Sequence, residues 1–278
     1  MKNKRLLIIN SVKTLFVNLL LILVFFFPVV WIFLTSLKTQ SEIYAFPISY
    51  WPRKITLENY HLVLRGSGFS RYLINSLIVS LGTTLLVVLL AFLGAYFFAR
   101  TKLKGRKPLL LFVLMISMFP PIAVAPPLFI FFRKVGLINN YLGLILAHSG
   151  LFSPIAVWIL TNFLKSVPFE LEDAAKVDGC GVLGIIKNVI LPLSLPGLAA
   201  TFLIVFVFSW CEFLLSLVLL NQNELRTAVV GIALYPGEYA FPWELISTAT
   251  FLALLPIIFF VFVFQRLIIG GLTAGAIK

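Results

Sequence analysis

The stretch YLINSLIVSLGTTLLVVLLAFLGAYFFA, residues 72–99, decides the fold of this chain. It runs for 28 residues without a charged side chain, between Arg71 and Arg100. A helix of about 20 apolar residues is long enough to span the hydrocarbon core of a bilayer. We therefore expect a transmembrane helix over residues 73–99.

The composition of the whole chain agrees with a membrane protein. Of its 278 residues, 61% are hydrophobic and only 12% are charged, and the mean hydropathy is +1.07. An ordinary soluble domain is about 25% charged. A water-soluble protein of this size could not hide so much apolar surface, so the composition excludes a soluble enzyme.

Other long uncharged runs predict five more spans. The uncharged runs are 14–37, 108–132, 135–164 and 245–265, and residues 188–223 contain one charge, Glu212. With the first stretch they predict an all-α membrane protein with a single transmembrane domain over residues 1–278. The six expected helices cover about 15–37, 73–99, 109–132, 142–164, 196–220 and 245–265.

The first run begins with the sequence MKNKR and resembles a secretory signal peptide at its start. Its apolar stretch is much longer than the apolar region of a signal peptide, and no small-residue cleavage site follows it. We expect a retained helix. The next segment, Ser36–Tyr72, is too polar to span a bilayer and too aromatic for a disordered linker. We expect it to form a structured cap, partly at the membrane interface, where Trp and Tyr are favoured.

The basic residues predict the orientation. The net charge is +12, from 22 Lys and Arg against 10 Asp and Glu, which in a soluble protein would suggest a nucleic-acid partner. Here 14 of the 22 basic residues fall in segments 1–13, 100–107, 165–195 and 266–278, and five of these lie within 100–107. Short loops rich in Lys and Arg stay in the cytoplasm. Both termini are therefore expected to be cytoplasmic, and no nucleic acid is expected.

The loop 165–195 is unusual because it contains four of the ten acidic residues. Ser166 as N-cap, Pro168 in the first turn and Gly179 as the stop predict a helix of about three turns between them. Leu171, Ala174, Ala175 and Asp178 then share one face, on which the two alanines would let another backbone approach closely. Periodicity alone leaves two interpretations open: a docking helix, or an amphipathic surface loop without a partner.

The same loop resembles a known motif. The order Glu172, Asp173, Ala174, Ala175, Asp178, Gly179, with Leu191 and Pro192 beyond the glycine, is similar to the EAA loop of bacterial ABC importer membrane subunits. Two positions depart from that pattern: Asp173 replaces the usual Glu and Val189 the usual Ile. Both substitutions keep the charge or the branched apolar character, so we expect the function of the loop to be kept.

The resemblance extends over nearly the whole chain and is strongest to sugar-importer permeases of the maltose-permease type, with their type I ABC importer fold. It is carried by the segments 72–77, 95–100 and 118–120, by Ser209–Phe213, which has Cys211 in place of the family's Asn, and by the tail 271–278.

The resemblance implies a division of work between subunits. This chain would form the translocation path with a second permease, usually a different chain, for a sugar or oligosaccharide. Pro168–Gly179 would be the coupling helix that docks on a cytoplasmic ATPase dimer, and the tail would reach toward the interface of that dimer. Residues 221–243 would contact an extracytoplasmic solute-binding protein. A non-sugar solute such as a glycerol phosphate remains an alternative.

Four residues are candidates for the translocation path or for helix packing: Trp210, Glu212, Pro120 and Pro121. Glu212 is the only acid within an expected span, where a charge costs about 2.5–3.5 kcal/mol on insertion scales. It either faces the path or pairs with a neighbouring helix, or it makes a structural hydrogen bond. The prolines would free backbone carbonyls, which indicates either a break that lines the pore or an ordinary kink.

Other chemistry has little support in the sequence. His61 and His148 stand alone, Cys180 and Cys211 belong to no metal-binding motif, and no GxxxxGK[ST] motif is present. We expect no metal, no cofactor and no catalytic residues. An ion-driven secondary transporter usually has several ionisable residues at the midplane, and a membrane-embedded enzyme needs paired carboxylates or His clusters there. Only Glu212 qualifies here, so the enzyme has no support and the ion-driven secondary transporter stays as the alternative function.

Overall fold

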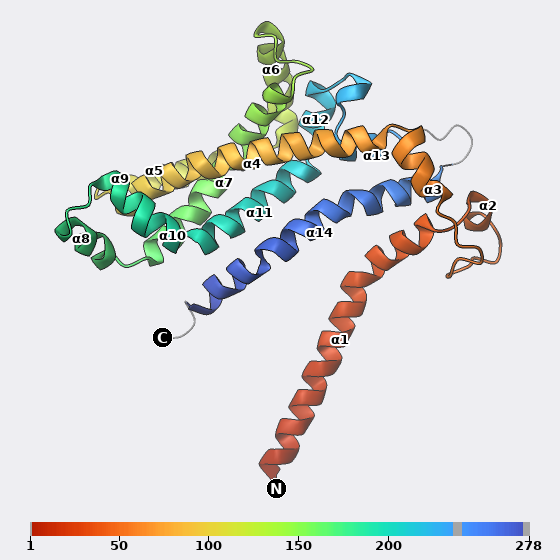
Figure 1. Ribbon diagram of the computed structural model, residues 1–278, viewed down its shortest axis with the longest axis horizontal. Coiled ribbons are helices and arrows are strands. Elements are labelled where there is room, and N and C mark those ends of the chain that lie inside the picture. The colour runs from red at the N-terminus through yellow and green to blue at the C-terminus, as the bar shows by residue number, and fades with distance from the viewer. Residues whose placement is uncertain (1, 236–240, 275–278) are drawn as a thin grey trace. The chain divides into compact units, whose positions relative to one another are not determined.

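The computed structural model describes residues 2–235 and 241–274, and over these the chain is helical without a β-strand (Figure 1). The helices are α1 Lys2–Ser36, α2 Gln40–Ile43, α3 Glu58–His61, α4 Phe69–Arg100, α5 Arg106–Ile116, α6 Pro121–Lys134, α7 Tyr141–Ser166, α8 Glu170–Val177, α9 Val182–Ile185, α10 Leu191–Leu193, α11 Leu195–Cys211, α12 Leu214–Leu219, α13 Ala228–Ala233 and α14 Trp243–Ala274. Short π-helical segments follow α3 and α9. The expected all-α class is confirmed.

Four helices are long and apolar enough to cross a membrane, and they correspond to the expected first, second, fourth and sixth spans. These four are the stretch Val17–Ser36 of α1, α4, α7, and the stretch Trp243–Ile268 of α14. Two bent pairs of helices could each form one more span. They are α5 with α6, bent by 83°, and Val182–Leu193 with α11, bent by 72°.

The expected third span, 109–132, is therefore two helices and not one. The break covers Ser117–Pro120, where Pro120 is extended (φ −65°, ψ 128°) and Pro121 starts α6. A proline disfavours the helical conformation of the residue before it, so a helix cannot run straight through this pair. Pro120 and Pro121 cause the bend.

The expected fifth span, 196–220, is wrong in its extent. Helix α11 ends at Cys211, Glu212 is extended (φ −70°, ψ 126°), and α12 is a separate helix of six residues. The stretch that pairs with α11 lies before it, in α9 and α10, and not after it. The apolar run is long enough for one membrane-spanning helix. The helix is nevertheless interrupted at Glu212, whose carboxylate accepts hydrogen bonds from the first turn of α12.

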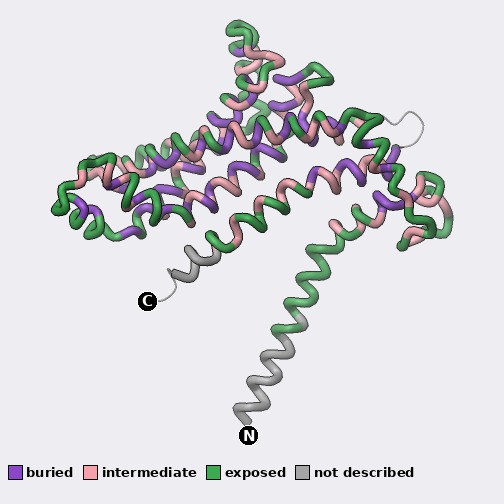
Figure 2. The backbone as a smooth tube through the Cα atoms, in the orientation of Figure 1, coloured by how far each residue is buried: buried purple, intermediate pink, exposed green. Residues whose placement is uncertain are grey.

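The chain forms two compact units, of which the first contains residues 1–70 and 234–254. Over 17–27 the side chains of α1 are exposed (Figure 2). Near its end α1 is tied to the segment 36–72: the Asn59 side chain donates hydrogen bonds of 2.8 Å to the carbonyl oxygens of Ser36 and Lys38. The Phe33 ring lies 4.9 Å from that of Phe251 in α14, centroid to centroid.

The second unit contains residues 71–233 and 255–278. Here α7 packs along α11, and Gly197 permits the close approach: a Cβ atom there would lie 2.5 Å from the Phe163 ring. The core between α4, α7 and α11 is built from small and branched side chains such as Ala95, Leu160 and Val205. The same core continues into α8 and α9, which lie at one end of this unit (Figure 1).

Candidate functional site

Helix α8 is shorter than expected and starts later. It covers eight residues from Glu170, and Ser166 is not its N-cap because Ser166 is the last residue of α7 and donates to the Phe163 carbonyl at 2.7 Å. The predicted stop is confirmed. Gly179 has φ +83°, and the amides of Gly179 and Cys180 bond back to the carbonyls of Lys176 and Ala175. This left-handed termination is a common end of a helix.

The side chains of α8 divide into an inward and an outward set. Glu172 and Ala175 are 4% and 8% exposed, and Ala175 belongs to the core between α4 and α7. Leu171, Ala174 and Asp178 are exposed. Ala175 is therefore packed against its own chain, and the expected face with both alanines open to a partner is not formed.

The inward set is held by a buried ion pair with Arg100, the last residue of α4. Arg100 Nε pairs with Glu172 Oε1, and both side chains are 6% exposed. The Tyr96 hydroxyl donates to Glu172 Oε2 at 3.2 Å. Breaking such a buried pair by removing one partner costs about 3–5 kcal/mol, because a charge is left uncompensated. The pair fixes α8 to the end of α4.

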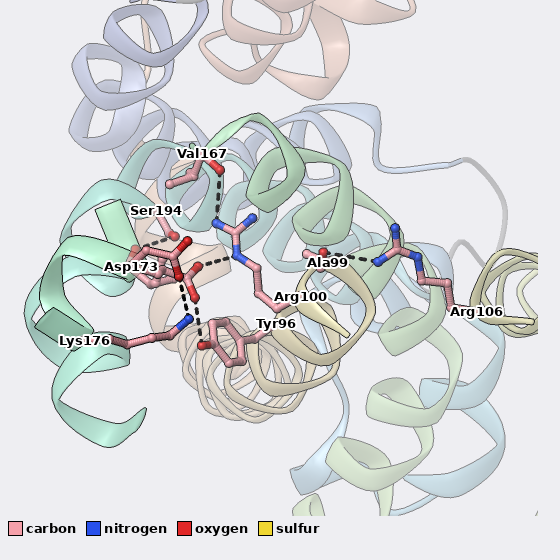
Figure 3. A network of polar contacts seen from close by, with 10 residues as sticks. Tyr96, Ala99, Arg100, Arg106, Val167, Asp173, Lys176 and Ser194 are labelled. Atoms are coloured by element: carbon pink, nitrogen blue, oxygen red, sulfur yellow. Dashed lines mark hydrogen bonds and ion pairs between the residues drawn. The ribbon is translucent and has the colours of Figure 1, made fainter. Parts of the chain in front are cut away.

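Arg100 also contacts the segment that joins α7 to α8. Its Nη2 donates to the Val167 carbonyl at 3.1 Å, and the guanidinium lies 4.4 Å from the centroid of the Phe169 ring. Figure 3 shows the guanidinium between the Val167 carbonyl and α8. One arginine therefore positions both the start of α8 and its first turn. In the sequence, Arg100 counted only among the basic residues that orient the chain in the membrane. The acidic residues of the loop 165–195 were the signal that a basic side chain could pair with them.

The outward set carries a looser ion pair. Lys176 donates to Asp173 at 2.7 Å, with side chains 60% and 69% exposed (Figure 3). This hydrogen bond, together with the charge of Lys176, lowers the pKa of the Asp173 carboxyl. Solvent-exposed pairs of this kind contribute little stability. Beside them Val177 is 88% exposed, so the outer surface of α8 combines acids with apolar side chains.

Leu191 and Pro192 lie at the bend before α11. They form α10 and are exposed, whereas Ile190 just before them is fully buried in the core that contains Ala175. The Ser194 hydroxyl closes the joint by donating to the Ile190 carbonyl at 2.6 Å. The core thus contains a residue from α8, Ala175, and the residue just before α10, Ile190.

Glu212 lies in a second polar cluster, at the break between α11 and α12. Its carboxylate accepts from the amides of Leu215 (2.8 Å) and Ser216 (3.0 Å), and it lies 3.0 Å from Nε2 of His148. The other ring nitrogen of His148 lies 2.9 Å from the Ser209 hydroxyl. Glu212 therefore starts α12 and joins it to α7. The sequence alone leaves three roles open for Glu212. The observed contacts agree with two of them, pairing with a neighbouring helix and a structural hydrogen bond.

The expectation that His148 stands alone is wrong. It lies within α7, is fully buried, and has a partner on each ring nitrogen. Sequence patterns missed it because its partners are 61 and 64 residues away. Within the described residues no group of three metal-binding side chains occurs.

The four candidates for the path lie in different surroundings. Trp210 is 2% exposed and stacks on Phe206, with ring centroids 5.6 Å apart. Pro121 lines an apolar cavity of about 240 Å³ with Phe119 and Leu215, whereas Trp210 and Glu212 do not line it. Two predicted contact regions fall partly outside the described residues: 236–240 within 221–243, and 275–278 in the tail.

Comparisons with known proteins agree with the motif. Residues 88–273 match the model of the family "Binding-protein-dependent transport system inner membrane component". The sulfoquinovosyl glycerol transport system permease of Agrobacterium fabrum is 39% identical, over 91% of this chain and 88% of the relative. The trehalose transport system permease of Mycobacterium tuberculosis is 39% identical, over 90% and 92%. The trehalose/maltose transport system permease of Thermococcus litoralis is 35% identical, over 94% of both.

A solved structure has the same fold. A chain of a bacterial ABC transporter involved in the import of the acidic polysaccharide alginate superposes with a TM-score of 0.77 at 21% identity, over 93% of this chain and 96% of that one. The family match covers most of the chain, and the sequence relatives cover nearly all of it. The chain therefore belongs to the family of inner membrane components of binding-protein-dependent transport systems.

Proposed function

We propose that this chain is a permease subunit of an ATP-driven ABC importer for a sugar or oligosaccharide. The family is that of binding-protein-dependent transport, and the three relatives above are named for trehalose, maltose or a sugar glycerol. ATP hydrolysis is then the work of a separate subunit, and this chain supplies the path and the docking surface. A second permease, of a different sequence, completes the path.

The observation that carries the proposal is the anchoring of α8. A helix that transmits the motion of an ATPase needs one side held firmly by the permease and another side free to dock. Glu172 and Ala175 form the held side, and the exposed Asp173, Ala174 and Asp178 form the free side. Because Arg100 is the last residue of α4, a movement of α8 is passed directly to a membrane-spanning helix.

The same ion pair supports the proposed topology. Arg100 and Glu172 belong to two loops, 100–107 and 165–195, that the distribution of basic residues assigns to the cytoplasm. Their contact brings both loops to one end of the second unit. We propose six spans, counting each bent pair as one, with cytoplasmic termini. The segment 221–243 then faces the opposite side, where it would meet the solute-binding protein.

The test is uptake by the complex reconstituted into liposomes. Copurification of an ATPase subunit and ATP-dependent uptake of trehalose, maltose or a longer oligosaccharide are expected. Uptake driven by an ion gradient without ATP would instead support a secondary transporter. Uptake of a glycerol phosphate but of no sugar would keep the importer and change its solute. Deletion of residues 168–179 is expected to abolish ATP-driven uptake, and intact uptake after this deletion would overturn the proposal.

A further inference from the structure

A cavity of about 300 Å³ lies within the first unit, and no residue of α8 or of the Glu212 cluster lines it. It is formed by the end of α1, by α2 and the loop after it, and by the start of α14. The side chains that line it are mostly polar or aromatic and include Trp31, Thr35, Lys38, Glu42, Ser49 and Trp243. The cavity has the size of small-molecule sites, which occupy about 300–1,000 Å³.

Lys38 is a buried cation in this cavity. It is 3% exposed, and its Nζ donates to the Ser49 carbonyl at 2.5 Å and lies 5.0 Å from the centroid of the Trp31 ring. Among the residues whose side chains are described, none places a carboxylate within 4.0 Å of this ammonium. A buried charge without a counter-charge is costly. An ammonium has three N–H donors, so two remain for an anion.

A second donor lines the same cavity. Thr35 is 8% exposed, it lines the same cavity, and its hydroxyl oxygen is buried without a hydrogen-bond partner in the structure. Buried hydroxyl groups are normally hydrogen-bonded. Lys38 and Thr35 together are suited to the oxygens of a phosphate group.

The cavity also contains an anion. Glu42 is half-buried, and its Oε1 accepts the amide of Arg53 at 2.6 Å, which leaves the other carboxylate oxygen available for a cation. A ligand that carries both a phosphate and an ammonium therefore matches the charges of the cavity better than a simple anion does.

The location of the cavity identifies the source of such a ligand. The apolar stretch Val17–Ser36 ends two residues before Lys38, and the stretch Trp243–Ile268 begins at Trp243. Trp is enriched where a membrane-spanning helix meets the headgroup layer. At that depth the abundant phosphates are those of phospholipids. We therefore expect the cavity to lie at the level of the headgroups.

We propose that this cavity binds the headgroup of a phosphatidylethanolamine molecule. Its phosphate accepts from Lys38 Nζ and the Thr35 hydroxyl, and its ammonium lies against the Glu42 carboxylate. The lipid phosphate places a negative charge in direct contact with the Lys38 ammonium, which no described carboxylate does.

The experiment is native mass spectrometry of the full-length chain, with the subunits that copurify, titrated with phosphatidylethanolamine, phosphatidylglycerol and phosphatidylcholine. One tightly bound phosphatidylethanolamine is expected on the wild-type protein. The variant K38M should bind it about tenfold more weakly, the effect of losing one charged hydrogen bond. The exposed Lys54 provides the matched control, K54M, which should bind like the wild type.

Two further variants keep the proposal testable if K38M fails to fold. T35V removes only the hydroxyl group and should weaken binding a few-fold. E42Q should abolish the preference for phosphatidylethanolamine over phosphatidylglycerol. Equal binding by the wild type, K38M and T35V, or an unchanged preference in E42Q, would overturn the proposal.

Soluble competitors distinguish the source of the phosphate and the class of ligand. Inorganic phosphate and O-phosphoethanolamine should not displace the lipid. Displacement by either would indicate a site for a soluble phosphate, and displacement by trehalose or maltose would indicate a site for the solute; each result overturns the lipid assignment. The assay measures neither uptake nor ATP hydrolysis, so its outcome is independent of the proposed function.

Discussion

Arg100 at the end of α4 and Glu172 on α8 form an ion pair in which each side chain is only 6% exposed. The pair joins a membrane-spanning helix to a short helix that presents acids and apolar side chains outward. Through this pair and Ala175, the loop 165–195 packs against the core of the second unit. The contact that we propose for coupling is therefore also a buried ion pair.

Replacing both charges should cost less stability than replacing one. The variants R100M and E172M each leave a buried charge without its partner, and each should lower the free energy of unfolding by about 3–5 kcal/mol. The double variant R100M/E172M should recover most of that loss. Thermal unfolding in detergent measures all three. Additive losses in the double variant would mean that the two side chains do not interact.

The end of α8 depends on the left-handed backbone of Gly179. A Cβ atom at this position meets nothing within 4 Å, so the substitution G179A tests only the strain at φ +83°. A loss of about 1 kcal/mol or more is expected. The matched control is G181A, because Gly181 also has open space and an ordinary φ of −72°. Equal stability of the two variants would contradict the assigned termination of α8.

Glu212 should contribute to stability through the start of α12 and the contact with His148. E212A removes the acceptor of two amides and the partner of a buried ring, and a loss of about 1–3 kcal/mol is expected. E212Q keeps an oxygen acceptor and should lose less. The exposed Glu224 provides the control E224Q, expected to unfold like the wild type. Wild-type stability, assembly and transport in E212A would exclude both a structural and a path role for Glu212.

The outer surface of α8 should determine ATPase binding without affecting the fold. Val177 is 88% exposed, so V177D adds a charge where nothing in the chain is displaced. We expect V177D to unfold at the wild-type temperature and to lose most of the copurifying ATPase. I55D changes a residue that is 70% exposed in the first unit and should retain the ATPase. Full ATPase recovery with V177D would place the docking surface elsewhere.

The apolar runs predicted the class of the fold because a bilayer requires spans of a certain length. They predicted the four long helices but not the breaks. Pro120 and Pro121 signalled one break in the sequence. At the other break, the contact of Glu212 with His148 could not be predicted, because His148 is 64 residues away in the chain. In α8, periodicity grouped Ala175 with exposed residues, and only the packing of α4 and α7 shows that it faces inward. The EAA resemblance identified the loop. It did not show that Glu172 is buried against Arg100 while its neighbours are exposed.

If Glu172 couples α8 to the permease as proposed, the number of sugar molecules transported per ATP hydrolysed depends on its charge. This ratio is measured in the reconstituted complex with the variant E172Q and with the control variant E170Q, because Glu170 is exposed. E172Q replaces a hydrogen bond to a charged group by a neutral one. This loss lowers the population of molecules in which α8 is docked on α4 by about tenfold or more. We expect E172Q to lower the ratio by about tenfold and E170Q to leave it unchanged. An unchanged ratio in E172Q would contradict the coupling role of Glu172.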